Sequence, residues 1–307
     1  MEATAGCSGE TRILLQNMGR SLTLLLLSCG IHPIWNGMNT LDDYLRVCEE
    51  AVRTGGRVVQ DWVGRAEVRK KGPADLVTQA DLASQEAVRQ TVLGAFPEHG
   101  LLGEEKESGE TPVPVFSGGD RAEYRWIVDP LDGTVNFVHG VPHYCVSLAL
   151  ERNGELLVGA VYDPMLDECF TAAVGQGAHL NGRPIHTSAV PLLSEALAAV
   201  GFPPNVKRDS PDLALFLKML HRCQAIRRTG SSALNLCYLA AGRFDVYWSY
   251  SARIWDVAAG ALILREAGGW ITSPTGGGFH LEEAHFLATA NRELHAQLCE
   301  VAATAVG

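Results

Sequence analysis

The spacing of apolar residues after position 40 predicts two successive helices. Apolar residues of the first helix recur at intervals of four, three and four, namely Leu41, Leu45, Cys48 and Val52. This spacing places them on one helix face, and Thr40 with Asp43 can cap the start. Gly55 and Gly56 weaken the helix without a reason visible in the sequence. Thr78 can cap the second helix, expected over residues 79–95.

Alternation of apolar and polar residues in the middle of the chain predicts an antiparallel sheet. Its strands are expected at 144–151, 155–162, 168–174 and 179–185. Asn153 and Gly154 stand between the first two strands and are a strong hairpin signal. Shorter strands are expected at 66–69, before a loop at 70–73, and at 101–102.

Short strands alternate with helices after residue 191. The expected strands are 196–200, 225–227, 244–248, 270–272 and 286–288, and the expected helices are 212–222, 231–241, 255–267 and 291–303. We interpret this change of pattern as the border between an N-terminal α+β lobe at 38–190 and a C-terminal α/β lobe at 191–307. A chain of 307 residues is long enough for two lobes.

Residues 1–37 differ in pattern from the rest of the chain. An apolar run at 22–29 is shorter than the roughly 20 residues that span a bilayer. Arg12 and Arg20 precede this run, so a short signal peptide remains an alternative. We prefer a mis-assigned start codon, with translation from Met38, or a disordered extension.

Composition excludes several classes of protein. Charged residues make up 20% and hydrophobic residues 47% of the chain, as in an ordinary globular protein. The net charge of −10 argues against a nucleic-acid-binding surface. Eight cysteines without a C-x-x-C pair indicate reduced, buried thiols rather than disulfides or zinc. We therefore expect a cytoplasmic protein with neither a nucleic acid nor a membrane as partner.

The most informative stretch is 126–137, with the sequence WIVDPLDGTVNF. Its apolar start reads as a buried strand that ends at Asp129, because Pro130 cannot donate to a sheet. Asp132 and the following Gly-Thr pair suit the first turn of a helix, where free N–H groups attract an anion. Two carboxylates directed at one small volume are compatible when a hard cation such as Mg²⁺ lies between them. The alternative is a turn with two solvated acids.

Three further segments complete a pattern. DLVT at 75–78 is followed by Asp81, Gly103 precedes two glutamates, and WDVAAG stands at 255–260. In this order the four segments resemble the signature of the inositol monophosphatase family of metal-dependent, lithium-sensitive phosphatases. The resemblance runs from about residue 40 to the C-terminus. It implies a layered αβαβα sandwich and a homodimer.

The resemblance also implies a set of metal ligands. Asp129 would bridge two Mg²⁺ ions, with Glu104 and the backbone carbonyl of Leu131 completing the first site. Asp132 and Asp256 would complete the second, and a third, weaker ion is expected near Glu104. Two metals bind phosphate oxygens, activate water and stabilise the leaving oxygen, which a phosphate monoester requires.

The remaining catalytic positions follow from the same resemblance. Thr134 with Asp81 would orient and deprotonate the attacking water, beside Glu104. The N–H groups of Gly133 and Thr134 would hold the phosphate. Lys70 matches a charged position near the site, although the adjacent Lys71 leaves that choice open.

Several of these residues have a structural alternative. Asp81 suits a first helical turn by its charge alone, and Asp256 can serve as a helix cap. Glu104 and Glu105 can both be loop acids, and either can be the acid of the site. Conversely, no member of the expected metal set is missing, and a catalytically inactive relative would be expected to lack one.

The sequence narrows the substrate only partly. The resemblance places substrate hydroxyls at Gly230, Ser231 and Ser232, and in the loop before residue 255. Ser249 stands where the inositol enzymes carry a hydroxyl-binding Glu, and Arg253 could instead favour a second anionic group. Inositol-1-monophosphatase is the leading expectation. Fructose-1,6-bisphosphatase, histidinol-phosphatase and nucleotide 3′-phosphatase are the alternatives, as is a metal-stabilised binding or regulatory protein.

Overall fold

The structure is a computed structural model that describes residues 40–72, 75–105 and 122–305, and Met38–Gly307 form one compact unit. The helices are α1 (Leu41–Asp61), α2 (Gln79–Ala95), α3 (Thr134–Val138), η1 (Leu193–Glu195, a 3₁₀ turn), α4 (Pro211–Met219), α5 (Ser232–Ala240), α6 (Ile254–Glu266) and α7 (Arg292–Ala303). The strands are β1 (Val68–Gly72), β2 (Asp75–Thr78), β3 (Gly100–Gly103), β4 (Tyr124–Asp132), β5 (Cys145–Arg152), β6 (Glu155–Asp163), β7 (Glu168–Ala173), β8 (Ala178–Leu180), β9 (Arg183–Ile185), β10 (Leu197–Val200), β11 (Ala225–Arg227), β12 (Val246–Ser249), β13 (Trp270–Thr272) and β14 (Phe286–Thr289).

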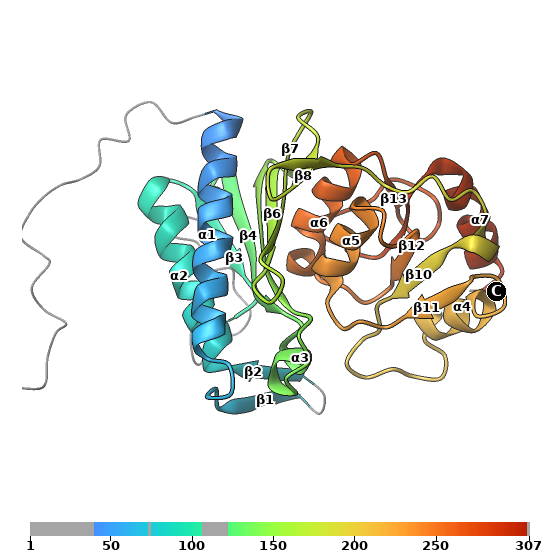
Figure 1. The fold of residues 1–307 in the computed structure, drawn as a ribbon, viewed down its shortest axis with the longest axis horizontal. Coiled ribbons are helices and arrows are strands. Elements are labelled where there is room, and N and C mark those ends of the chain that lie inside the picture. The colour runs from blue at the N-terminus through green and yellow to red at the C-terminus, as the bar shows by residue number, and fades with distance from the viewer. Residues whose placement is uncertain (1–39, 73–74, 106–121, 306–307) are drawn as a thin grey trace, which may run out of the picture. The chain divides into compact units, whose positions relative to one another are not determined.

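These elements form five layers (Figure 1). Helices α1 and α2 cover one face of a seven-stranded sheet of order β3-β4-β5-β6-β7-β8-β9. Helices α5 and α6 lie between its other face and a five-stranded sheet of order β11-β10-β12-β14-β13. Helices α4 and α7 pack together beyond that second sheet. The predicted αβαβα sandwich is confirmed.

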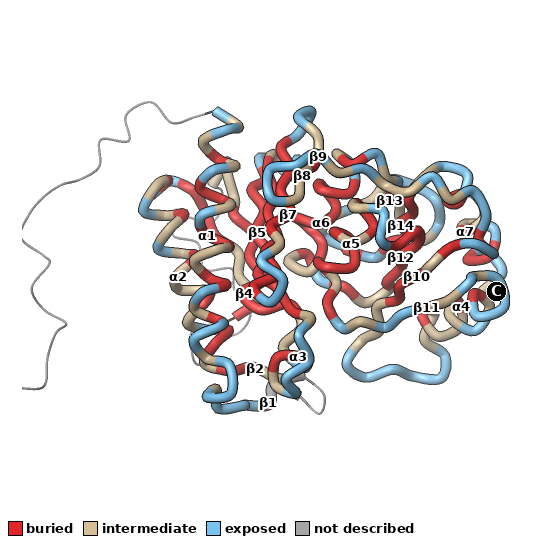
Figure 2. Tube along the Cα trace, viewed as in Figure 1, coloured by how far each residue is buried: buried red, intermediate tan, exposed pale blue. Residues whose placement is uncertain are grey.

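The central strands β4 to β7 of the seven-stranded sheet are largely buried, as the red tube in Figure 2 shows, whereas β8 and β9 at the edge are more exposed. In β5, Val146 and Leu148 pack toward α1 and α2, whereas Cys145 and Ala149 pack toward α5 and α6. Alternate residues of a strand point to opposite faces, so a strand covered on both faces is apolar almost throughout. This double burial stabilises the sheet that carries the central acidic stretch.

Helix α1 needs its two glycines for close packing. A Cβ on Gly55 would lie 2.8 Å from the Ser84 Oγ of α2, and one on Gly56 would lie 2.5 Å from the Tyr162 ring of β6. Real Cβ atoms do not approach that closely, so the glycines allow α1 to contact both neighbours. The sequence alone offered no reason for this pair because the contacts are distant in the chain.

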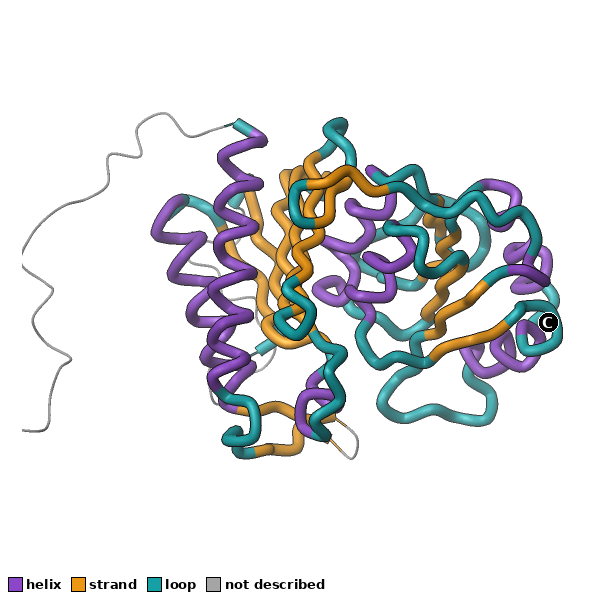
Figure 3. The backbone as a smooth tube through the Cα atoms, viewed as in Figure 1, coloured by secondary structure: helices purple, strands orange, loops and turns teal. Residues whose placement is uncertain are grey.

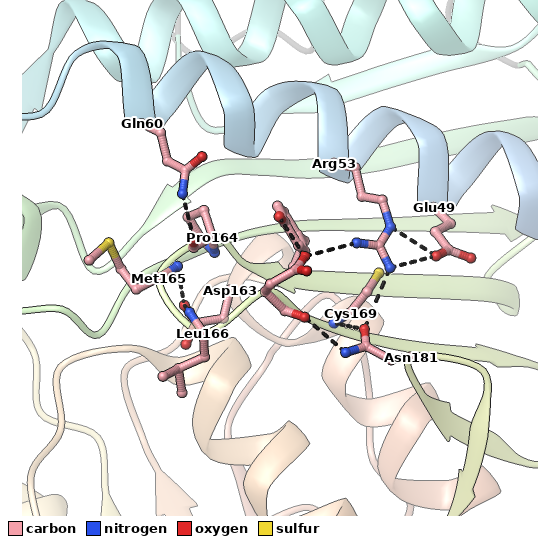
Figure 4. Close-up of polar contacts among 11 residues, drawn as sticks. Glu49, Arg53, Gln60, Asp163, Pro164, Met165, Leu166, Cys169 and Asn181 are labelled. Carbon is pink, nitrogen blue, oxygen red and sulfur yellow. Dashed lines mark hydrogen bonds and ion pairs between the residues drawn. The ribbon is translucent and has the colours of Figure 1, made fainter.

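Figure 4 shows how α1 is also tied to the turn between β6 and β7. The Arg53 guanidinium lies 2.9 Å from Glu49 of the same helix and 3.4 Å from Asp167 of the turn. It also covers the Tyr162 ring, with 5.0 Å from the Arg53 Cζ to the ring centroid. Partly exposed ion pairs contribute little each, so this contact orients the turn more than it stabilises the fold.

Most predicted helices and strands are confirmed to within a few residues (Figure 3). The expected strand 179–185 is instead two strands, β8 and β9, which pair antiparallel across a turn at Asn181 and Gly182. Both predicted caps are present, since Thr40 and Thr78 each accept a backbone hydrogen bond in α1 and α2. The expected loop at 70–73 is wrong for 70–72, which continue β1 and pair with β2. The expected end of the central strand is also wrong, because β4 runs through Pro130 to Asp132. A bulge next to Pro130 removes the need for its missing N–H.

No helix among the described residues is long and apolar enough to cross a membrane. The extension at 1–37 lies outside the described residues. The division into lobes at 38–190 and 191–307 stays a prediction.

Candidate active site

A bulge in β4 directs Asp129 and Asp132 to the same face of the sheet. Asp129 pairs with Ser147 of β5 and Asp132 pairs with Cys145, so the two residues between the acids oppose a single residue. In a regular strand, residues three apart point to opposite faces. The extra residue turns Asp132 back to the face that packs against α5 and α6.

The turn after β4 brings Thr134 to Asp81. Gly133 caps α3 with φ +96°, and a Cβ there would lie 3.0 Å from a backbone carbonyl oxygen, so only glycine fits. The Thr134 Oγ1 lies 3.2 Å from the Asp81 Oδ1 and 3.0 Å from the Leu131 carbonyl oxygen. The other Asp81 oxygen accepts hydrogen bonds from the N–H and hydroxyl of Thr78. Asp81 is therefore a fully buried and oriented acceptor for the Thr134 hydroxyl.

Glu104 and Glu105 follow β3, which runs parallel to β4. The Glu104 N–H donates to the Val128 carbonyl oxygen at 3.2 Å, which places Glu104 beside the end of β4. The Glu104 charge acts on both Asp129 and Asp256. Glu105 is buried, and the Gln85 side chain of α2 binds its backbone. Glu104 is thus the glutamate that lies near the other acids.

Asp256 enters the site from the first turn of α6. Its Oδ2 accepts a hydrogen bond of 2.7 Å from the Arg253 N–H, so the capping role expected as an alternative is present. Burial raises the pKa of Asp256 well above its ordinary value, and the neighbouring charges of Asp132 and Glu104 raise it further. The capping bond uses one carboxylate oxygen and leaves the other for a ligand.

The electrostatics of the four acids suit a divalent cation. Asp129 is 2% exposed. Its burial raises its pKa well above the ordinary value, and the charges of Glu104, Asp132 and Asp256 raise it further. Carboxylate oxygens are the ligands that Mg²⁺ prefers, and a cation among them removes their repulsion. Among the described residues, however, no three His, Cys, Asp or Glu side chains stand close enough together to hold a metal ion as they are placed.

Asp132 differs from its neighbours because hydrogen-bond donors surround it. Burial raises its pKa, whereas the Ser231 hydroxyl and the Ala233 N–H, at the start of α5, lower it. Donors to the charged form favour ionisation. Asp132 is thus better prepared than Asp129 to remain a carboxylate inside the protein.

The residues expected to bind substrate lie at the carboxyl ends of the parallel strands. Gly230 follows β11 with φ +93°, and a Cβ there would meet the Asn136 amide at 2.9 Å. The neighbouring Ser231 is buried and Ser232 is half-buried. Ser249 ends β12 and is only 2% exposed, and its Oγ accepts the Ser251 N–H at 3.3 Å. Open α/β sheets bind ligands at this edge.

A cavity of about 410 Å³ opens beside the start of α6. Arg253 lines it from the loop before α6, and Glu282, Glu283 and His285 line it from the connection between β13 and β14. Glu282 pairs with Arg125 at 2.7 Å, which offsets its charge. Lys70 belongs to β1, and its side chain lies outside the described residues.

Two residues near the acids were missed by reasoning from sequence. Cys145 lies opposite Asp132, with its Sγ 3.8 Å from the Asp132 Oδ2, a contact that depends on strand register. Asn136 donates to the carbonyl oxygens of His143 and Thr229, at 2.7 and 2.8 Å, and so joins the α3 turn to the loop before α5. An Asn two residues after the Gly-Thr pair was a visible signal for Asn136. No local signal marked Cys145.

Comparisons with known proteins identify the family of the chain. The profile of the inositol monophosphatase family matches residues 40–306. An inositol-1-monophosphatase of Rhizobium meliloti is 42% identical over 261 residues, covering 84% of this chain and 95% of the relative. A Nus factor SuhB of Pseudomonas aeruginosa is 38% identical over 250 residues, covering 80% and 90% of the two chains.

Solved structures show the same fold. The SuhB protein of Bartonella henselae matches with a TM-score of 0.77 at 37% identity, covering 84% of this chain and 98% of that one. An inositol monophosphatase from Anabaena matches with a TM-score of 0.75 at 36% identity, covering 87% and 97%. With a family match over residues 40–306, the chain belongs to the inositol monophosphatase family.

Proposed function

We propose that the protein is a Mg²⁺-dependent phosphomonoesterase acting on a small polyol or sugar phosphate, with inositol-1-monophosphatase as the leading activity. The observation that carries this proposal is the contact between Thr134 and Asp81 beside the four acids, Glu104, Asp129, Asp132 and Asp256. A protein that only bound a metal would need the acids but not this pair.

The acids would hold two or three Mg²⁺ ions, which would neutralise the phosphate and lower the pKa of a bound water. Asp129 is our candidate for the bridging ligand because all three other acids act on it. Glu104 and the Leu131 carbonyl oxygen would complete one site, and Asp132 and Asp256 the other. The bulge in β4 permits this division, since it brings Asp129 and Asp132 to one face.

Thr134 would direct the attacking water. If its one hydroxyl hydrogen goes to Asp81 at 3.2 Å, and not to the Leu131 carbonyl oxygen at 3.0 Å, the Thr134 oxygen would have lone pairs left to accept a hydrogen bond from water. Loss of a water proton to Thr134 and of the Thr134 proton to Asp81 would leave a hydroxide aimed at phosphorus. Gly133 and Thr134 would contribute N–H donors to the phosphate.

The substrate pocket supports a broader substrate range than inositol monophosphate alone. Ser249 contributes no charge, and its oxygen already accepts the Ser251 N–H. Arg253 lines the neighbouring cavity, where a second phosphate or carboxylate would find a cation. Fructose 1,6-bisphosphate, histidinol phosphate and nucleotide 3′-phosphates are therefore the alternative substrates.

A regulatory binding role is the competing proposal, because several similar relatives are named Nus factors. We still favour a small phosphate ester over nucleic acid as partner, since the net charge is −10. We also propose a cytoplasmic homodimer inhibited by lithium. The six cysteines of the described residues are free, which suits a reducing compartment.

The decisive experiment is phosphate release with Mg²⁺ from inositol 1-phosphate, fructose 1,6-bisphosphate, histidinol phosphate and adenosine 3′,5′-bisphosphate. We expect turnover of at least one, inhibited by lithium and by chelation. Asp129→Asn replaces the bridging carboxylate with a neutral amide of the same size, so it should abolish turnover without unfolding the protein. Near-normal Mg²⁺-dependent turnover by this variant would refute the two-metal assignment, and inactivity of the unmodified protein on all four would favour the binding role.

A further inference from the structure

Asp132 is held by the first turn of α5. Its Oδ2 accepts a hydrogen bond of 2.6 Å from the Ser231 hydroxyl and one of 2.7 Å from the Ala233 N–H. Ser231 is the N-cap of α5, and its Oγ also accepts the Leu234 N–H at 3.3 Å. The Ser231 hydroxyl thus accepts a hydrogen bond from the α5 backbone and donates one to Asp132.

A third side chain closes the surroundings of the same oxygen. The Cys145 Sγ lies 3.8 Å from the Asp132 Oδ2 and 3.7 Å from the Ser231 Oγ. Cys145 and Ser231 are 0% and 1% exposed. A thiol is a weak donor, so Cys145 contributes chiefly by excluding water from Oδ2. The bonds of Ser231 and Ala233 are consequently made in a dry environment, where they are strong.

These contacts divide the two carboxylate oxygens of Asp132 between two tasks. Oδ2 accepts the Ser231 hydroxyl and the Ala233 N–H, and the Ser232 N–H also acts on this carboxylate. Oδ1 would then be the oxygen offered to a cation. The N-terminal end of a helix also favours a negative charge on a carboxylate that its N–H groups contact. Because Asp132 belongs to β4 and Ser231 to α5, the bond joins elements 99 positions apart in the chain.

We propose that Ser231 is a positioning residue that orients Asp132 for metal binding, rather than a residue that contacts the substrate. This inference rests on the proposed Mg²⁺-dependent function. The direction of the Ser231 hydroxyl carries it, since that hydroxyl is buried and aimed at Asp132. Groups that orient metal ligands typically change metal affinity by 10–100-fold when removed.

The test is the Mg²⁺ affinity of Ser231→Ala, Ser231→Gly and Ser231→Thr, measured by calorimetry without substrate. Alanine and glycine both remove the hydroxyl, but glycine is a tolerable N-cap and alanine a poor one. We expect both to weaken Mg²⁺ binding about tenfold or more, and threonine, which keeps the hydroxyl, to restore it. In phosphate release, the half-saturating Mg²⁺ concentration should rise while KM for substrate at saturating Mg²⁺ stays unchanged.

Thr40→Ala is the control, because it removes a helix cap in α1, outside the site. It should lower stability without changing Mg²⁺ affinity. The inference is overturned if Ser231→Gly keeps normal affinity, if only alanine weakens it, or if the variants raise KM with Mg²⁺ binding intact. In those cases the proposed phosphatase still stands. If the unmodified protein neither binds Mg²⁺ nor releases phosphate, the proposed function and this inference fail together.

Discussion

At the scale of single residues, the site is shaped by acids that are buried, as Asp129 and Asp132 are, or half-buried, as Glu104 and Asp256 are. Burial is the largest cause of the raised pKa of Asp129, Asp132 and Asp256. A buried carboxylate can stay ionised only where hydrogen-bond donors or a cation stabilise its negative charge. For Asp132 the compensation is visible in the donors of α5, whereas Asp129 accepts one backbone N–H, that of Leu131, and otherwise faces other acids. A bound cation would offset the negative charges of these acids.

Ser249 is where a single residue would set substrate preference. Ser249→Glu should raise kcat/KM for inositol 1-phosphate about tenfold or more, because a hydrogen bond to a charged group is worth about 1.5–3 kcal/mol. The added negative charge should lower kcat/KM for fructose 1,6-bisphosphate by repelling its second phosphate. Steady-state kinetics on both substrates measures the change.

Ser249→Gln is the matched control, since it has the length of Glu without the charge. Ser249→Gln should lower kcat/KM for fructose 1,6-bisphosphate less than Ser249→Glu does. A shift of both substrates in the same direction would mean that residue 249 does not set specificity. Both larger side chains must fit beside Gly201, which lies close to residue 249: a Cβ on Gly201 would lie 2.9 Å from the Ser249 Oγ.

Asp212 should make stability depend on pH. This acid of α4 is 2% exposed and accepts the Tyr250 N–H at 2.7 Å. Burial raises its pKa to about 6, above the unfolded value of about 3.9. Between these values the folded protein binds more protons than the unfolded chain, so the Asp212 contribution to stability falls as pH rises from about 4 to 6. The cost at neutral pH is on the order of 2–3 kcal/mol.

Asp212→Asn should remove this dependence while its amide oxygen still accepts the Tyr250 N–H. Urea unfolding from pH 4 to 8 should show the variant gaining on the unmodified protein up to about pH 6 and then running parallel to it. Asp212→Ala should lose the same pH dependence but be less stable than Asp212→Asn at every pH, because the Tyr250 N–H is left unpaired. A constant difference between Asn and Asp across this range would disprove the assignment.

At the scale of elements, local signals in the sequence predicted the helices. Where the structure differs from the prediction, non-local packing is the cause. The caps at Thr40 and Thr78 and the hairpin at Asn153 and Gly154 depend on neighbouring residues, and each was predictable. The bulge in β4 was not, because it is defined by the register of β5. Pro130 indicated a break in the strand, and the chain uses a bulge instead.

Two helix glycines distinguish packing from helix propensity. Gly56→Ala should lower the free energy of unfolding by up to about 2 kcal/mol, because an overpacking cost of about 1–3 kcal/mol opposes a propensity gain of about 1 kcal/mol. The new Cβ would lie 2.5 Å from the Tyr162 ring, which Arg53 covers. Gly94→Ala in α2 should instead stabilise by up to about 1 kcal/mol, since a Cβ there has no neighbour within 4 Å. Urea unfolding at fixed Mg²⁺ compares the two, and equal stabilisation by both would refute the close contact.

At the scale of the whole molecule, the layers follow from which faces must be covered, but their order does not follow from periodicity. The sequence showed antiparallel strands followed by alternating strands and helices, and only the family resemblance implied αβαβα. Strand order in the second sheet places β10 between β11 and β12, so two strands that are consecutive in the chain are not neighbours in the sheet. For the same reason the acids were predictable as residue types, while the Ser231 contact with Asp132 required the structure.

The unit from Met38 should be sufficient for folding and activity. Residues 38–307 form one compact unit, and the family match begins at residue 40. The capping box of Thr40 and Asp43, which begins α1, lies wholly within this part of the chain. A chain shortened to begin at Met38 should therefore match the full chain in urea unfolding and in Mg²⁺-dependent phosphate release. A chain beginning at Tyr44 is the control, because it lacks the cap and should lose about 1 kcal/mol or more. If the Met38 chain is insoluble, less stable or less active, residues 1–37 contribute to the folded protein and the border at Met38 is wrong.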